Sequence, residues 1–367
     1  MKLTRVVGAV CLLAIVFTFL SCSDERPDAP VDQPGALPDD LLDHSHLEQR
    51  KISGRLLATG ESFGNLGAIA WDRDGVIWIG DRSGDPFLHN VAPGQGDLIR
   101  SMGLNGEGPG DYRNVWDIFP IHSGGVWVHD NTLSRLTQQF ARDSNPTGRI
   151  VDLPGSPRLL VVGPTGTGFV GWSVDTAARL TFMDSLGVVR ARSEGPLLGA
   201  DTVPLRQRMV ATAQLKICGS PDGGRVAIAF ASAGRIELRD AFGSMIGVAD
   251  VPFPSAGDFG IDAEGNLIHK RVKRYYFACD ASNDFLLAAF SGMDERMNPE
   301  GTAWRTTNLG WHLHAFDWDG RLVATWQTDI PVTRIAWDAD GGKLYATEAE
   351  TGSVYVFDIE VPRAEVR

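Results

Sequence analysis

The sequence predicts an all-β fold, a six-bladed β-propeller of four-stranded antiparallel blades. Two observations carry this prediction: a hairpin motif that occurs near both ends of the chain, and short strands of alternating polarity between the two copies. Amphipathic helical periodicity is hard to find after residue 50. The 42 glycines and 20 prolines among 367 residues suit a protein with many tight turns.

The repeated motif is IAWDRDGVIWIGD at residues 69–81, with a near copy, IAWDADGGKLYAT, at residues 335–347. Each copy has the pattern of an apolar strand, an Asp-containing turn closed by Gly, and a second apolar strand. We predict that the copies belong to the first and last blades and lie side by side. The acidic residues of the motif are then turn residues rather than catalysts: Asp72, Asp74, Asp338 and Asp340.

The strands expected between these copies group into units of four. Unit one comprises residues 68–71, 76–80, 86–91 and 98–102, and unit two comprises residues 115–120, 125–129, 133–141 and 149–153. Unit three comprises residues 158–162, 168–173, 179–184 and 188–193, and unit four comprises residues 215–219, 225–231, 235–240 and 245–251. Unit five comprises residues 275–280, 285–291, 313–317 and 321–327, with a long insertion after its second strand. Unit six has only three strands, at residues 334–337, 343–347 and 353–358.

Residues 52–59 can supply the missing strand of unit six. An open ring would expose the apolar faces of its first and last blades, so the N-terminal strand is expected to close it. Residues 252–274 contain a further hairpin-like stretch, which is either an extra hairpin or part of a seventh blade. We expect six blades.

Two segments resemble a known family. GLNGEGPGDY at residues 103–112 is similar to the GxxGxGPGxF/Y segment of NHL-type repeats and of secreted six-bladed propeller lipoproteins. HAFDWDGR at 314–321, followed by IAWD at 335–338, resembles the end of the latter family, the TolB-like six-bladed propellers. The resemblance covers residues 51–360, leaves 361–367 as a tail, and implies the fold but little about activity. Units three and five depart from the NHL consensus.

The first 22 residues have the pattern of a lipoprotein signal peptide. Lys2 and Arg5 precede an uncharged apolar run at residues 6–20 that is short for a membrane span. The run ends at Cys22, in a context that resembles the bacterial lipobox, although Leu20 lies one place closer to the Cys than usual. We predict lipidation of Cys22. The alternative is an ordinary secretory signal with an incidental Cys.

Residues 23–50 are rich in Pro and acidic residues and are expected to form a disordered tether. The sequence thus predicts an exported monomer, anchored to a lipid bilayer of the bacterial cell envelope. Outside the signal only Cys218 and Cys279 remain, either as a disulfide or as two buried thiols. The net charge of −12, without long basic runs, argues against nucleic acid as a partner.

The insertion at residues 292–311 is the candidate binding element, because long loops in compact domains often bind ligands. Its aromatic and Arg side chains suit sugars, aromatic ligands or peptide side chains. A solvated loop beside a basic strand edge explains the same residues. The candidate ligand-binding residues are Arg274, Arg296, Trp304, Arg305, Trp311 and His312.

Other motifs are weaker. His312 and His314 lie on one face of a strand and could share a metal, but further ligands are not evident, so no metal or cofactor is predicted. The glycines of residues 106–110 fit a tight crossing between blades better than a phosphate loop, since no helical pattern follows. GESFG at residues 60–64 matches GxSxG by chance, because it lacks the strand–turn–helix context.

The predicted function is therefore a binding platform for an envelope protein, a carbohydrate or a peptide, with no catalytic residue assigned. The alternative is a metal-dependent enzyme of the lactonase or lyase kind, with its site in the central channel. Similar propellers hold such a metal with residues from several blades, and no such set is evident here.

Overall fold

The structure is a computed structural model. It describes residues 49–60, 63–82, 84–121, 123–143, 147–154, 159–165, 168–173, 179–194, 215–253, 259–261, 267–269, 274–292, 296–297, 304–305, 310–348 and 351–362. The predicted signal, Cys22 and nearly all of the tether lie outside these ranges. Every element of regular secondary structure in these ranges is a β-strand, which confirms the all-β prediction. Within these ranges there is no helix that could span a membrane.

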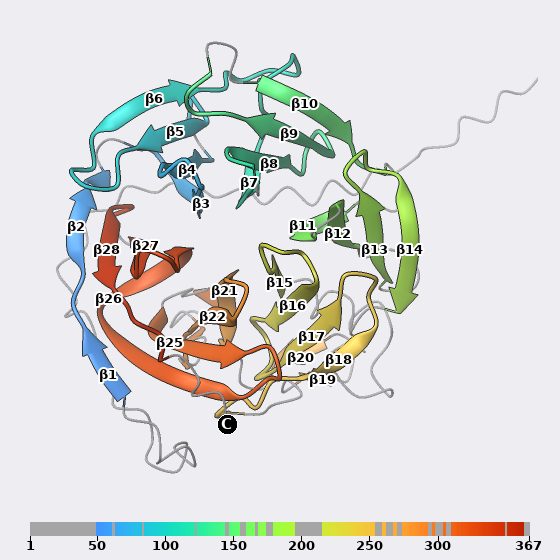
Figure 1. Ribbon diagram of the computed structural model, residues 1–367, viewed down its shortest axis with the longest axis vertical. Coiled ribbons are helices and arrows are strands. Elements are labelled where there is room, and N and C mark those ends of the chain that lie inside the picture. The colour runs from blue at the N-terminus through green and yellow to red at the C-terminus, as the bar shows by residue number, and fades with distance from the viewer. Residues whose placement is uncertain are drawn as a thin grey trace, which may run out of the picture. The chain divides into compact units, whose positions relative to one another are not determined.

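Four blades are separate antiparallel sheets of four strands arranged around a common axis (Figure 1). Blade 1 comprises β3 (Leu66–Trp71), β4 (Ile77–Asp81), β5 (Leu88–Val91) and β6 (Leu98–Met102). Blade 2 comprises β7 (Val115–Pro120), β8 (Val126–Asp130), β9 (Arg135–Gln139) and β10 (Thr147–Asp152). Blade 3 comprises β11 (Leu159–Thr165), β12 (Gly168–Ser173), β13 (Arg179–Asp184) and β14 (Val189–Glu194). Blade 4 comprises β15 (Leu215–Gly219), β16 (Arg225–Phe230), β17 (Ile236–Asp240) and β18 (Met245–Val248).

The rest of the ring is one eight-stranded sheet. Its main path runs β2 (Arg55–Ala58), β28 (Val354–Asp358), β27 (Lys343–Glu348), β26 (Leu322–Asp338), β25 (Gly310–Asp317), β22 (Phe285–Phe290) and β21 (Tyr276–Ala281). β26 is 17 residues long; its first half pairs mainly with β25 and its second half with β27. The sheet therefore has a fifth four-stranded part, β21 to β26, and a sixth, β26 to β2. The sequence predicted two separate strands where β26 is continuous.

The N-terminal strand closes the ring, as predicted. β2 pairs antiparallel with β28, with Leu56 opposite Tyr355. The twin motifs meet at this seam: the Trp71 and Tyr345 rings stack with centroids 5.1 Å apart, and Leu57 is buried in the same cluster. A further strand was not predicted. β1 (Gln49–Ile52) pairs parallel with the first half of β26, so residues 49 and 50, expected to lie in the tether, belong to the sheet.

Asp72 and Asp338 act in turns, as the repeated motif predicted. The Asp72 carboxylate accepts hydrogen bonds from Val76 N at 2.9 Å and from Trp78 Nε1 at 2.6 Å. Burial raises the pKa of Asp72, while the bond from Trp78 opposes that shift. Asp338 accepts a hydrogen bond from Gly341 N at 2.9 Å.

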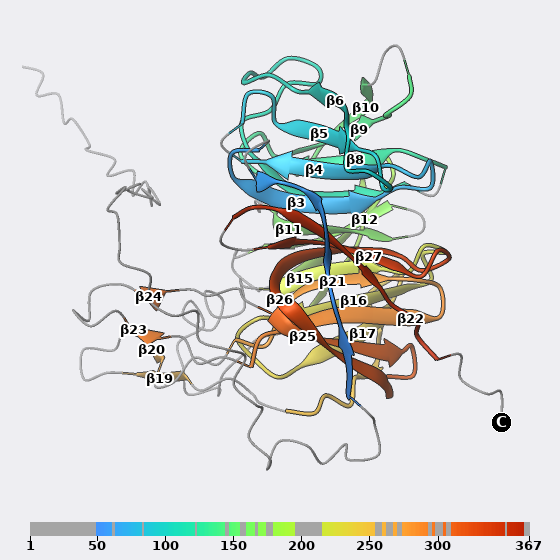
Figure 2. The ribbon, with the colours of Figure 1, turned by 90° about the vertical axis from the view of Figure 1, so that its left-hand side faces the viewer.

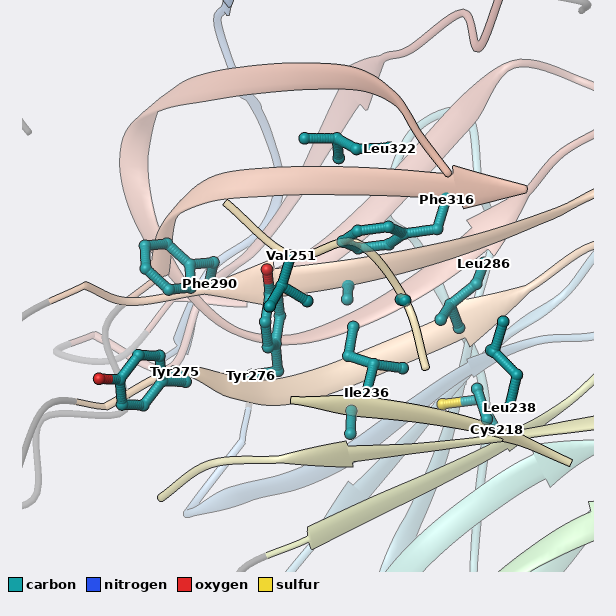
Figure 3. Close-up of a cluster of buried hydrophobic side chains, with 14 of the residues drawn as sticks. Cys218, Ile236, Leu238, Val251, Tyr275, Tyr276, Leu286, Phe290, Phe316 and Leu322 are labelled. Carbon is teal, nitrogen blue, oxygen red and sulfur yellow. The ribbon is translucent and has the colours of Figure 1, made fainter. Parts of the chain in front are cut away.

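The hydrophobic core lies between neighbouring blades. One cluster joins blade 4 to the β21–β26 part of the large sheet and includes Ile236, Leu238, Tyr276, Phe290 and Phe316 (Figure 3). Aromatic side chains fill the interfaces between blades, because these large groups fit the wedge-shaped space between twisted sheets. Figure 2 shows the blades of the ring edge-on.

Two small hairpins lie outside the blades. β19 (Phe259–Ile261) and β20 (Leu267–His269) form one two-stranded sheet, and β23 (Arg296–Met297) and β24 (Trp304–Arg305) form another. In the described part of residues 252–274, β19 and β20 pair antiparallel with each other, as in the extra hairpin that was one of the two predictions.

The glycine-rich segment 103–112 forms the crossing from blade 1 to blade 2. Arg135 donates hydrogen bonds to the carbonyl oxygens of Glu107 at 2.9 Å, Gly108 at 3.0 Å and Asp111. Gly103 has φ of 82°, and a Cβ there would lie 2.6 Å from the buried Tyr112 ring. The glycines thus serve the backbone path.

Replacing Arg135 by Met should lower the free energy of unfolding by about 2–4 kcal/mol, because three carbonyl groups of the crossing lose a charged donor. Urea denaturation followed by circular dichroism measures the change. Arg192→Met, at an exposed position of β14, is the matched control and should change stability by less than about 0.5 kcal/mol. Equal effects of the two substitutions would contradict the role given to Arg135.

Candidate functional site: the axial cavity

A cavity of about 570 Å³ lies at the axis of the ring. It is lined by the first strands of the blades, β3, β7, β11, β15 and β21, by the second half of β26, and by the turns that follow these strands. Asp117 and Lys216 lie near the starts of β7 and β15, and Arg334 lies near the start of the second half of β26, whereas Ser220, Asn283 and Asp340 lie in the following turns. The cavity therefore runs along the axis.

One wall of the cavity is aromatic. Phe119, Trp127 and Phe169 line it where blades 2 and 3 meet, and the Trp127 and Phe169 rings pack edge to face with centroids 5.1 Å apart. Arg149 spans the same two blades and donates a hydrogen bond to Ser185 O at 3.3 Å. Such a wall offers apolar and π contacts to a ligand of small-molecule size.

The other feature of the cavity is a charged cluster formed by residues from different blades. Lys216 Nζ of blade 4 lies 2.6 Å from Asp117 Oδ1 of blade 2. Burial lowers the pKa of Lys216 to about 8, although Asp117 opposes this shift. Burial and the like charge of Arg82 lower the pKa of Arg334 to about 10, again against Asp117.

Arg82 is the third cation of this cluster. It follows β4 and its side chain lies over Gly67, where a Cβ would come within 2.7 Å of Arg82 Cγ. Its guanidinium carbon lies 4.6 Å from the centroid of the Trp116 ring. Burial lowers the pKa of Arg82, and Asp117 raises it. The missing side chain at position 67 thus gives Arg82 its place beside the other charges.

Asp280 is a second half-buried carboxylate that lines the cavity, and it joins the two parts of the large sheet. Its oxygens accept hydrogen bonds from Trp337 N at 2.7 Å and Ala281 N at 2.8 Å. Burial raises its pKa to about 6 against these bonds. The adjacent Cys279 forms a disulfide with Cys218, which joins β21 to β15 with the Cα atoms 6.1 Å apart. Both cysteines line the cavity.

The structure places three of the candidate binding residues in the interior. Arg274, Trp311 and His312 are buried, with exposed fractions of 4%, 8% and 4%. Trp311 belongs to β25 and not to the insertion, so the strand begins earlier than predicted. Arg296 pairs with Arg305 and Met297 with Trp304 across the β23–β24 hairpin. The structure describes the backbone of Arg296, Trp304 and Arg305 but not their side chains, so their role in binding stays a prediction.

The two strand histidines are packed among aromatic rings. His312 Nδ1 is hydrogen-bonded to Gln49 Nε2 at 2.9 Å, which ties β1 to β25. His314 Nδ1 is hydrogen-bonded to Tyr276 OH at 3.0 Å, and its ring stacks on Phe290. Burial lowers the pKa of His312 to about 4. Within the described ranges no group of three or more His, Cys, Asp or Glu side chains could hold a metal ion.

Sequence reasoning missed the axial cluster. Asp117, Lys216 and Arg334 are separated by long stretches of chain and form no motif. The available signal was a single charged residue in each of β7, β15 and the predicted strand 334–337, which are otherwise largely apolar. In a closed ring such residues converge on the axis, so the pattern becomes informative only when the strands are assigned to blades.

No protein-family model matches the chain, and no curated protein matches it. Solved structures similar to it include a streptogramin B lyase, with 10% identity, a TM-score of 0.49, and coverage of 84% of this chain and 98% of that one. A catalytically inactive variant of virginiamycin B lyase from Staphylococcus aureus, solved with quinupristin, has 12% identity, a TM-score of 0.49, and coverage of 84% and 100%. The Cps50 (Swd1) β-propeller domain of Myceliophteria thermophila has 11% identity, a TM-score of 0.45, and the same coverage. At this level of similarity the comparisons carry no argument about activity; the strand pairing itself shows that the chain is a β-propeller of four-stranded antiparallel blades.

Proposed function

We propose that this propeller is a ligand-binding platform whose binding site is the axial cavity. The observation that carries the proposal is a cavity of about 570 Å³ that combines an aromatic wall with a half-buried charged cluster. Its volume falls within the range of small-molecule sites, and its side chains stand on strands of several blades, which hold them in fixed positions. We count the eight-stranded sheet as two blades that share β26, which makes the ring six-bladed.

A blocking variant tests this proposal. Ala339 is exposed and lines the cavity in the turn after β26, so Ala339→Trp should obstruct the site without disturbing the core. Leu98→Trp, at an exposed position on the outer strand of blade 1, is the matched control. We expect small molecules that raise the Tm of the wild type in a thermal-shift screen to bind at least tenfold more weakly to Ala339→Trp and normally to Leu98→Trp. Binding that Ala339→Trp leaves unchanged would place the site elsewhere.

We further propose that the platform is an exported lipoprotein of the bacterial cell envelope, a monomer anchored in a bilayer through Cys22. Its similarity to TolB-like propeller lipoproteins and its signal-like N-terminus support this. The Cys218–Cys279 disulfide also supports it, because disulfides persist in oxidising compartments outside the cytoplasm. An envelope protein, a carbohydrate or a peptide would be the molecule it holds. Cys22→Ala should move the protein from the membrane to the soluble fraction; a processed variant that stays on the membrane would contradict lipidation at Cys22.

An enzyme of the metal-dependent lactonase or lyase kind is the second candidate. The observation that favours it is Asp280, a cavity carboxyl group whose pKa burial raises to about 6, in the range of a general base. Metal analysis of the purified protein separates the two candidates. A tightly held divalent ion in a one-to-one ratio would favour the enzyme, and a metal-free protein that still binds its ligand would favour the platform.

A further inference from the structure

We propose that the axial cavity recognises the anionic group of its ligand, a carboxylate or a phosphate, through Lys216 and Arg334, with Arg82 adding positive charge behind them. This inference rests on the proposed binding role of the cavity and specifies the chemistry of what it takes. Its basis is an imbalance of half-buried charge at one end of the cavity.

The described groups that interact there carry more positive than negative charge. Lys216, Arg334 and Arg82 are cations, and all three interact with one carboxylate, Asp117. Asp117 Oδ1 is bound to Lys216 Nζ at 2.6 Å. The nearby Asp280 is held by two backbone N–H groups and does not pair with these cations. Three cations thus share one carboxylate.

Several donors of this cluster have no hydrogen-bond partner among the described residues. They are Arg334 Nε, Arg82 Nε and Arg82 Nη2, and each of these atoms is buried. Another donor of the cavity wall, Trp337 Nε1, is in the same state. Buried N–H groups of cations are costly to leave unpaired, and a bound oxyanion would satisfy them. Guanidinium and ammonium groups form strong charge-assisted hydrogen bonds with carboxylates and phosphates.

The positions of the other charged residues of the cavity indicate at which end the anionic group of a ligand would bind. Arg73, Asp338 and Asp340 lie at the turn end, where Arg149 also lines the wall. The excess of positive charge is therefore confined to the strand-start end. An anionic group bound there would direct the rest of the ligand along the axis, past the aromatic wall of Phe119, Trp127 and Phe169.

Titration calorimetry of the mature protein with four matched probes tests the inference. Benzoate and phenyl phosphate carry an anion on a phenyl ring, benzamide is a neutral analogue of benzoate, and benzylamine is a cation. We expect both anions to bind at least tenfold more tightly than benzamide and benzylamine not to bind. The ratio of the two anions distinguishes a carboxylate site from a phosphate site.

Three variants assign the contact. Arg334→Met should weaken benzoate binding at least tenfold, and Arg192→Met on the surface should leave it unchanged. Asp117→Asn should strengthen it, because the competing carboxylate is removed while an isosteric side chain remains. Opposite effects of Arg334→Met and Asp117→Asn cannot both come from unfolding, and the Tm of each variant checks the fold.

The dependence on pH supplies an independent readout. Lys216, whose pKa burial lowers to about 8, loses its positive charge as the pH rises through that value, and the charged groups that face it are Asp117, Arg334 and Arg82. Benzoate binding should therefore weaken as the pH rises through about 8, and Lys216→Met should lack this step.

The outcomes separate the two proposals. Equal binding of benzoate and benzamide, or benzoate binding that Arg334→Met leaves unchanged, would overturn the anion inference while the cavity remains the binding site. Binding of benzylamine in preference to benzoate would do the same. If no probe binds and no screened compound is sensitive to Ala339→Trp, both proposals are wrong.

Discussion

Replacing Cys218 and Cys279 together by Ala should lower the free energy of unfolding by about 4 kcal/mol, as expected for a crosslink that closes a loop of this length. The two cysteines are separated by 61 residues in sequence and join the first strands of neighbouring blades. Removing the bond frees the unfolded chain more than it changes the folded one. Urea denaturation of the wild type and the double variant measures the difference.

The reductant supplies the control for this prediction. Dithiothreitol should destabilise the wild type by most of the difference between it and Cys218→Ala/Cys279→Ala, and should leave the double variant unchanged. A double variant as stable as the oxidised wild type would show that the ring does not depend on this crosslink. Since Cys218 is buried, with 7% of its surface exposed, Ala also removes some packing, and the reduced wild type separates that contribution.

Leu57→Asp should cost at least about 3–5 kcal/mol and leave the ring open in part of the population. Leu57 lies on β2 and is 6% exposed, in the cluster that joins the twin motifs across the seam. The substitution removes its apolar contacts and places a carboxylate in an apolar cluster. Leu56 lies next to it on the same strand, is 47% exposed, and provides the matched control.

Leu56→Asp should change the free energy of unfolding by less than about 1 kcal/mol. The two variants introduce the same charge into the same strand, so the comparison isolates burial at the seam. Proteolysis at the N-terminal strand provides a second readout, because an open seam should make residues 49–58 accessible to a protease. Equal stability of the two variants would contradict closure by β2.

The sequence predicted the fold from features that are local. Residues 69–81 and 335–347 each contain a whole hairpin, so their pattern could be read directly, and closure by residues 52–59 followed from the need to cover apolar edges. β26 was harder to predict. Residues 328–333, which include Pro331, were left between two predicted strands, but the structure carries the chain through them as one strand.

The candidate site was harder to predict because its residues come from different blades. Asp117, Lys216 and Arg334 meet only after the ring closes, and each alone looks like an ordinary charge on a strand. The aromatic residues of the insertion drew attention because they are close in sequence, yet Trp311 is buried in β25. The spacing of residues along the chain predicts which of them meet in a hairpin. It does not predict which residues of different blades meet at the axis of the ring.

A crystal structure of the mature protein with phenyl phosphate tests the central claim most directly. We predict density for the phosphate group within hydrogen-bond distance of Lys216 Nζ and Arg334 Nε, with the phenyl ring beside Phe119, Trp127 or Phe169. Ligand density at the insertion around Trp304 and Arg305, with the axial cavity occupied only by water, would contradict it.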